Sequence, residues 1–289
     1  MAGTVTAGPG GTASAQPLDS GAARSRASGL GPPSALQAAG SDVIESRRVL
    51  ATRVDAVDYD AASRAILQRA RSGEPAYVCV ATVHMLMEAH DSPEFQGVLE
   101  RASLVTADGV PVVWALRLLG AQGATRVCGP ELMPLLCGRA AAEDLPIGLF
   151  GGTPEVLQAL QTTLPRQHEG LRIAFACSPP FREPTREEDA AVVSRILESG
   201  ARLLFVGLGC PKQERWMAGH VSRLPLVQIG VGAAFDFLCG GKGRPPGLVQ
   251  SAGFEWAYRL WCEPRRLWRR YLYHNPRFLA LMAAQLMRG

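Results

Sequence analysis

The chain has 289 residues, of which 47% are hydrophobic and 19% charged, with a formal net charge of +4. This length and hydrophobic content suffice for one large α/β domain or two small ones. No run of 18 apolar residues occurs and no apolar segment follows Met1, so we expect neither a membrane-spanning helix nor a secretory signal. The seven cysteines are scattered without a C-x-x-C pair. We therefore expect reduced, mostly buried thiols in a cytoplasmic protein, and no zinc site.

Residues 1–45 differ in composition from the rest of the chain. They are rich in Ala, Gly, Ser and Pro and hold almost no large apolar residues. Such a segment buries too little surface to offset the entropy of ordering. We interpret it as a disordered leader or as the product of an upstream start codon. The predicted organisation is a leader (1–45), an α/β core (46–241) and a C-terminal appendage (242–289).

Predicted strands and helices alternate along the core. The strands are expected at 48–54, 76–81, 104–107, 147–150, 171–176, 203–206 and 226–231. The helices are expected at 61–72, 85–89, 111–119, 154–164 and 186–200, with one more beginning at residue 213. This alternation predicts an α/β fold with a parallel, Rossmann-like sheet and helices on both faces. In such folds ligands bind at the carboxyl ends of the strands.

One carboxylate is predicted at that edge of the sheet. Asp108 directly follows the strand at 104–107 and precedes Gly109. An Asp in this position is suited to act as a general base or to hold a ribose or sugar hydroxyl. The alternative is that it is the N-cap of the helix that begins near Pro111.

Glycine turns are predicted at the same edge. Gly207 and Gly209 lead from a strand into a helix that starts near Lys212, and free amides there, with Lys212, are suited to cradle a diphosphate. Gly151 begins a weaker turn of the same kind. None of these has the spacing of the dinucleotide fingerprint or the P-loop. A nicotinamide-dependent oxidoreductase is accordingly a weak alternative.

Positive charge is concentrated at the C-terminus. Residues 242–289 hold nine of the 30 Lys and Arg but only two of the 26 Asp and Glu. The net charge is therefore +7 on this segment and −3 on the rest of the chain. Such a partition suggests an anionic partner.

Helical geometry separates the candidate partners. If 260–272 is helical, Trp261 and Trp268 lie with leucines and Tyr271 within roughly 140° of arc. Four arginines take the other side: Arg265, Arg266, Arg269 and Arg270. This pattern is typical of a helix in a bilayer interface, with Trp261 and Trp268 as anchors and Arg265 and Arg270 on lipid phosphates. The alternatives are a surface helix packed on its own domain and, with less support, a nucleic-acid contact.

Six segments carry a resemblance to a known family. In chain order they are TADGVPVVWALRLLG, RVCGPELM, FGGTPEVL, GLGCPKQERWM, GVGAAFDFLCGGKGRPP and FEWAYRLWCEPRRLWRRYL. Together, from about residue 54 to 275, they resemble the successive blocks of the WecG/TagA/CpsF family of bacterial glycosyltransferases. The resemblance implies an inverting, metal-independent enzyme without a cofactor. It would move a sugar from a UDP-sugar to a polyprenyl-diphosphate-linked acceptor on the cytoplasmic face of the membrane.

The resemblance also implies roles for individual residues. Asp108 matches the proposed general base and Arg126 an active-site arginine. The implied substrate-binding residues are Gly151, Gly207, Gly209, Lys212, Gln213, Glu214 and Asp236, together with Arg259, Arg266 and Arg269 of the appendage. In the family the appendage closes over the active site and helps to bind the membrane, which agrees with the charge partition.

One departure from the family pattern concerns the strand at 76–81. The family usually has an active-site Asn after this strand, whereas the only Asn of this chain is Asn275. Thr82 or His84 fills that place, and the alignment leaves open which. Both side chains can hydrogen-bond a sugar hydroxyl, so we expect activity to be kept.

The sequence therefore predicts a peripheral membrane glycosyltransferase of cell-surface or exopolysaccharide synthesis. The donor sugar is left open among N-acetylmannosamine, its uronic acid, glucose and others, and homo-oligomer formation is left open as well. The alternative is a non-catalytic nucleotide-sugar-binding or scaffold protein with the same fold. A nucleic-acid partner is not expected.

Overall fold

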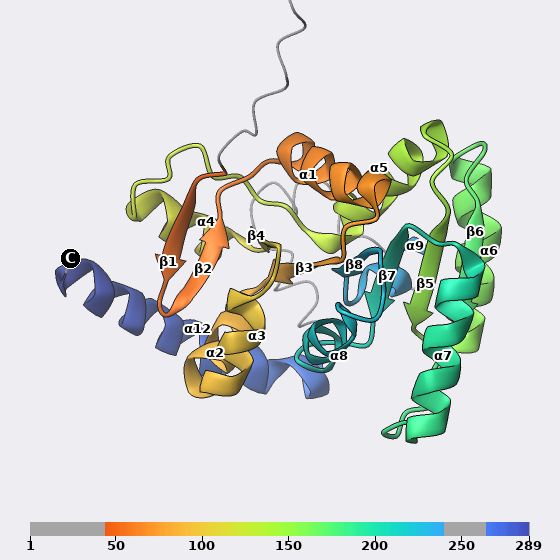
Figure 1. The fold of residues 1–289 in the computed structure, drawn as a ribbon. Coiled ribbons are helices and arrows are strands. Elements are labelled where there is room, and N and C mark those ends of the chain that lie inside the picture. The colour runs from red at the N-terminus through yellow and green to blue at the C-terminus, as the bar shows by residue number, and fades with distance from the viewer. Residues whose placement is uncertain (1–43, 240–263, 289) are drawn as a thin grey trace, which may run out of the picture. The chain divides into compact units, whose positions relative to one another are not determined.

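The computed structural model describes residues 44–239 and 264–288. At its centre is a six-stranded, fully parallel sheet with the strand order β4-β3-β8-β7-β5-β6 (Figure 1). Its strands are β3 (Ala76–Ala81), β4 (Leu104–Ala107), β5 (Ile147–Gly151), β6 (Ile173–Cys177), β7 (Leu203–Gly207) and β8 (Val227–Gly230). The predicted parallel α/β architecture is thus confirmed.

Helices cover both faces of this sheet. One face carries α1 (Tyr59–Ser72), α5 (Gly129–Ala142), α6 (Pro154–Gln167) and α9 (Ala234–Leu238). The other carries α2 (Val83–Asp91), α3 (Pro93–Glu100), α7 (Arg186–Ser199) and α8 (Lys212–His220), while α4 (Val110–Leu118) packs beside the strand β1 (Ser46–Val49). In Figure 1, α1 and α5 lie above the sheet and α2, α3 and α8 below it. Each face has its own cluster of buried apolar side chains.

Local sequence signals explain why the elements begin and end where they do. All six residues of β3 are buried, as expected of a continuous apolar run in a parallel sheet covered on both faces. Asp58 caps α1 by accepting from the Ala61 amide, and Gly73 ends the helix in the left-handed conformation (φ 70°). Helix α7 begins with a capping box between Thr185 and Glu188.

Two predictions of secondary structure were wrong. The single strand expected at 48–54 is an antiparallel hairpin, β1 (Ser46–Val49) and β2 (Thr52–Asp55), because Leu50 adopts a turn conformation with φ 57°. Helix α9 was not expected, nor were α3 and α5. The first turns of α3 and α5 contain Pro93 and Pro130, and α5 has Pro134 inside, so the pattern resembles a loop although proline is tolerated in a first turn.

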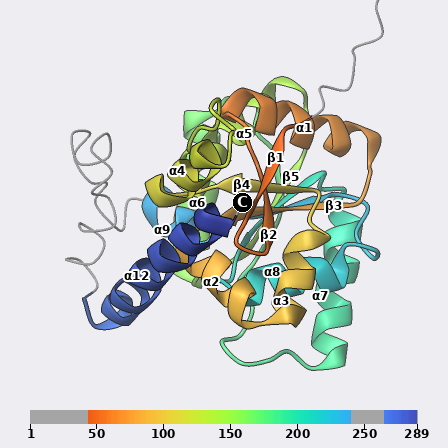
Figure 2. The ribbon, with the colours of Figure 1, turned by 90° about the vertical axis from the view of Figure 1, so that its left-hand side faces the viewer.

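A long C-terminal helix, α12 (Pro264–Arg288), runs alongside α2 (Figure 2). Phe278 and Met282 of this helix are buried and belong to the same apolar cluster as α2. Gln285 bonds to the β1–β2 hairpin where β1 enters the turn, accepting from the Leu50 amide and donating to the Arg48 carbonyl, each at 2.8 Å. Within the described ranges, no helix combines the length and apolar character needed to cross a bilayer.

Candidate active site at the carboxyl edge of the sheet

The residues predicted at strand ends lie along one edge of the sheet. Thr82 follows β3, Asp108 follows β4, Gly151 ends β5 and Gly207 ends β7. Because all six strands are parallel, these four ends share the carboxyl edge. The order of the strands places the ends of β3 and β4 next to each other, separated from that of β7 by β8.

Asp108 and Arg126 form an ion pair at this edge, with 3.2 Å between Nε and Oδ1. The Asp108 amide donates to the Ala81 carbonyl at 2.8 Å, which holds the residue beside the end of β3. The two side chains are 17% and 25% exposed, so the pair is partly shielded yet within reach of a ligand. The N-cap of α4 is Gly109, which has no side chain with which to cap the helix. The interpretation of Asp108 as that cap was therefore wrong.

Thr82 and His84 are the two candidates for the place of the Asn that the resemblance implies. Thr82 is the N-cap of α2, its hydroxyl accepting from the Met85 amide at 3.3 Å. His84 lies two residues after Thr82, in the first turn of α2, and its ring centroid is 5.0 Å from that of His274 of α12. The structure thus gives the Thr82 hydroxyl a capping bond and turns His84 toward the C-terminal helix.

Helix α5 begins at the same edge, three residues after Arg126. A Cβ at Gly129 would lie 2.6 Å from the Val231 carbonyl oxygen, so only glycine lets the first turn approach the end of β8 this closely. The amides of this first turn carry partial positive charge. Burial raises the pKa of the Cys128 thiol to about 12, with the nearby Asp108 carboxylate adding to the rise. This thiol is therefore protonated at neutral pH and is not a nucleophile.

The described cysteines are all free thiols. Cys79, Cys128 and Cys137 are buried, as expected, whereas Cys177, Cys210 and Cys239 are only partly buried.

The predicted phosphate-binding glycines meet each other in the structure. Gly151 pairs with Gly207 across β5 and β7, and a Cβ at Gly151 would lie 2.5 Å from the Gly207 carbonyl oxygen. A Cβ at Gly207 would lie 2.8 Å from the Phe235 ring. Gly209 has φ 81°, in the left-handed region. Close packing explains Gly151 and Gly207, and backbone conformation explains Gly209, whether or not a ligand also binds there.

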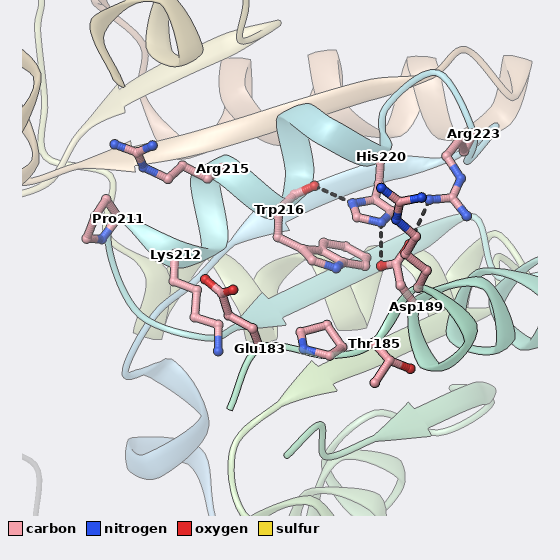
Figure 3. A pocket seen from close by; sticks show the side chains of 11 residues that line it. Glu183, Thr185, Asp189, Pro211, Lys212, Arg215, Trp216, His220 and Arg223 are labelled. Carbon is pink, nitrogen blue, oxygen red and sulfur yellow. Dashed lines mark hydrogen bonds and ion pairs between the residues drawn. The ribbon is translucent and has the colours of Figure 1, made fainter. Parts of the chain in front are cut away.

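The three residues of the Lys212 block point in different directions. Lys212 lines an open groove of about 750 Å³ between α8 and the start of α7 (Figure 3). Gln213 is 3% exposed and Glu214 0%, and the Gln213 amide nitrogen donates to the Glu214 carboxylate at 2.7 Å. The Gln213 side-chain oxygen accepts from the Gly209 amide at 3.2 Å. Gln213 therefore fixes the glycine turn from inside, and of these three only Lys212 lines the groove.

The groove contains residues that the sequence did not single out. His220 bridges Asp189 (Nε2 to Oδ1, 2.8 Å) and the Trp216 carbonyl (Nδ1 to O, 2.7 Å), and its ring stacks on Trp216 at 4.2 Å. Arg223 bonds to the other Asp189 oxygen at 2.8 Å (Figure 3). The residues that line the groove are Glu183, Pro184, Thr185, Arg186, Asp189, Pro211, Lys212, Arg215, Trp216, His220 and Arg223. Contacts between α7 and α8 bring these residues together, which no local motif signals.

Other predicted site residues lie on the helices or outside the described part of the chain. Asp236 is partly buried on α9, close after the end of β8. Trp268 lies on α12 and is 46% exposed. Arg259 and Trp261 are outside the described residues, and the structure gives only the backbone for Arg265, Arg266, Arg269 and Arg270. The roles predicted for them stay predictions.

Two acidic residues form a D-x-D pair in the described part of the chain. Asp58 and Asp60 follow β2 by a few residues. Asp58 caps α1 through a 2.7 Å bond from the Ala61 amide, and Asp60 forms an ion pair with Arg139. The pair therefore has a structural explanation, at the start of α1.

Comparison with known families agrees with this geometry. The sequence matches the model of the Glycosyl transferase WecG/TagA/CpsF family over residues 47–289, which includes the whole sheet and the C-terminal helix. Glycosyltransferases move a sugar from an activated donor to an acceptor. The chain belongs to the WecG/TagA/CpsF family of glycosyltransferases.

Proposed function

We propose that this chain is an inverting glycosyltransferase that uses a UDP-sugar. The acceptor is a sugar linked to polyprenyl diphosphate, in the synthesis of a surface polysaccharide or exopolysaccharide. The observation that carries the proposal is the position of Asp108 beside Arg126 at the carboxyl edge, where it does not cap α4. In the proposed reaction, Asp108 takes the proton of the acceptor hydroxyl as that oxygen attacks the anomeric carbon and UDP departs.

Cationic side chains and helix amides neutralise the departing diphosphate in this proposal. Arg126 and the first turn of α5 lie at the same edge as Asp108. Lys212 lines a groove whose volume falls in the range of ligand sites, roughly 300–1,000 Å³. Arg259, Arg266 and Arg269 of the appendage supply further charge. Arginine offers fixed charge and bidentate phosphate contacts, which suits a site that works without a metal.

The protein would work peripherally, at the cytoplasmic face of an anionic membrane. The +7 charge of residues 242–289 supports this location. So do the apolar side chains on α12, where Trp268 is 46%, Leu272 65% and Tyr273 61% exposed. An amphipathic basic helix with exposed aromatics is suited to the lipid headgroup region.

A non-catalytic nucleotide-sugar-binding or scaffold protein is the second candidate. It is favoured by one observation, the replacement of the usual active-site Asn by residues with other partners. The Thr82 hydroxyl caps α2, and His84 lies against His274. A protein that lost catalysis but kept binding would tolerate both changes.

A UDP-release assay separates the two candidates. The purified full-length protein is supplied with a panel of UDP-sugars and with polyprenyl-diphosphate-linked sugars. Release that depends on both donor and acceptor supports the transferase and names the sugars. If calorimetry shows that a UDP-sugar binds but no combination of donor and acceptor releases UDP, the chain is instead the non-catalytic binding or scaffold protein.

A further inference from the structure

A group of three side chains joins α2 to α12 beside the candidate site. His84 and Glu88 lie one turn apart on α2, and His274 approaches them from α12. The Glu88 carboxylate oxygen Oε1 is 3.7 Å from His84 Nδ1 and 3.8 Å from His274 Nε2. The candidate ligand atoms of the three side chains all lie within 4.8 Å of one another. Among the described residues, this is the group of His, Cys, Asp and Glu side chains that converges in this way.

These separations are close to those that a metal ion requires. In a tetrahedral zinc site, bond lengths of about 2.0–2.2 Å put neighbouring ligand atoms about 3.4 Å apart. The two distances to Glu88 exceed that value by a few tenths of an ångström. The remaining separation, between the two histidine nitrogens, is at most 4.8 Å, so the side chains must move closer together to hold an ion. The side chains are 17% (His84), 37% (Glu88) and 12% (His274) exposed, so the site is shielded but open to an ion.

Contacts that need no metal hold the two helices in register. One turn beyond Glu88, Asp91 forms a bidentate ion pair with Arg277, with distances of 2.5 and 2.6 Å. Phe278, four residues after His274, is 1% exposed within the apolar cluster. A site whose ligands are already positioned loses little entropy when it binds an ion.

We propose that His84, Glu88 and His274 bind one Zn²⁺ ion, which fastens the C-terminal helix to α2. Two imidazoles and a carboxylate favour Zn²⁺ over Mg²⁺ or Ca²⁺, which prefer oxygen ligands. Two ligands one turn apart on a helix and a third from a distant segment leave a fourth position for water. Both imidazoles bind as the neutral form, and no covalent bond is made or broken in the protein.

The proposed ion has a structural role that is separate from the transfer reaction. It holds His84, two residues after Thr82, and it fixes α12 at the point where the appendage reaches the body. Zinc would therefore set how firmly the helix that carries Arg266 and Arg269 docks beside the carboxyl edge.

The test measures zinc binding directly and does not depend on turnover. Full-length protein stripped with EDTA is titrated with Zn²⁺ by calorimetry in the presence of a competing chelator. We expect one ion per chain. His84→Asn, Glu88→Gln and His274→Gln should each weaken binding by more than the 10–100-fold that loss of an outer-shell partner costs. The matched controls are His90→Gln on the exposed side of α2 and Glu94→Gln on α3, which should bind as the unaltered protein does.

Cobalt distinguishes this site from the cysteines. Co²⁺ bound by imidazole and carboxylate should show visible d–d bands without the near-ultraviolet charge transfer of a thiolate. Three results overturn the proposal: no ion bound, binding that survives all three ligand variants, or a thiolate spectrum that persists in them. Each of these results leaves the proposed transferase untouched, and a failure of UDP release leaves the zinc site untouched.

Discussion

Asp108 and Arg126 approach within 3.2 Å at the carboxyl edge of the sheet, although they belong to different connections of the fold. The Val127 amide bonds to the Ala107 carbonyl at 2.9 Å, so the strand end itself carries Arg126 to the carboxylate. The backbone thus fixes the pair before any substrate arrives. In the proposed mechanism, this arrangement preorganises the general base and a cation for the leaving diphosphate.

Asp108→Asn tests the base. The substitution keeps the shape of the side chain and removes its basicity, so kcat should fall roughly 10²- to 10⁴-fold while UDP-sugar binding stays nearly unchanged. UDP release and donor calorimetry measure the two effects. Asp144→Asn is the matched control, because it also removes an Asp–Arg ion pair, with Arg172 at 2.9 Å, at the opposite edge of the sheet. Full turnover in Asp108→Asn would remove the residue from the mechanism.

Gly151→Ala tests the close approach of β5 and β7. Gly151 has φ 121°, and the new Cβ would lie 2.5 Å from the Gly207 carbonyl oxygen. The expected loss in the free energy of unfolding is about 1–3 kcal/mol or more, measured by urea denaturation. Gly219→Ala in α8 is the control, because nothing lies within 4 Å of its Cβ position. That variant should be unchanged or more stable by roughly 0.5–1 kcal/mol. Equal stability of the two variants would contradict the packing argument.

Strand-end residues were predictable from sequence, whereas contacts between distant segments were not. Strand β3 was located to the residue because a continuous apolar run has one favourable placement in a parallel sheet. The position of Asp108 at the carboxyl edge was predicted because this residue directly follows a strand and precedes a Gly. Gln213 and His274 show what the sequence could not predict. The burial of Gln213 and the position of His274 beside His84 depend on packing between elements that are distant in the chain. No periodicity or spacing encodes those contacts.

Turnover should not require added Mg²⁺ or Mn²⁺. The D-x-D carboxylates are occupied elsewhere, since Asp58 caps α1 and Asp60 pairs with Arg139. The proposed neutralising groups are Arg126, Lys212 and the appendage arginines. UDP release measured with and without Mg²⁺ and Mn²⁺ should be equal. A strict requirement for either ion would show that arginines do not neutralise the diphosphate. Zn²⁺ is held constant in both arms, so the proposed α2–α12 site does not confound the comparison.

The ion pair between Asp91 and Arg277 should make the docking of α12 depend on pH. The hydrogen bonds from Arg277 lower the pKa of Asp91 below its ordinary value. A lowered folded-state pKa contributes stability above the unfolded value of about 3.9, and this contribution is lost as the pH falls through the folded-state pKa. Because the pair is 34% and 39% exposed, the contribution is about 0–1 kcal/mol. Urea denaturation of the unaltered protein and Asp91→Asn should differ at pH 6 and converge under strong acid. A difference that persists unchanged in acid would refute this assignment.

The appendage arginines divide into two predicted groups. Arg265 and Arg270 should act as lipid contacts, each contributing about 1 kcal/mol to binding of anionic vesicles, an effect that salt screens. Trp261 and Trp268 should act as interfacial anchors. Replacing either by Ala should reduce the amount of protein that sediments with vesicles. Arg259, Arg266 and Arg269 should in addition contact the diphosphate.

A short soluble acceptor analogue separates these roles, because no membrane is present. Arg266→Ala and Arg269→Ala should lower turnover with this analogue, whereas Arg265→Ala and Arg270→Ala should not. Point variants are sharper here than truncation at Lys242, because truncation also removes Phe278 and Met282 from the apolar cluster. Full soluble-acceptor turnover in both Arg266→Ala and Arg269→Ala would limit the appendage to membrane binding. Arg126 with the first turn of α5 would then be left to stabilise the leaving group.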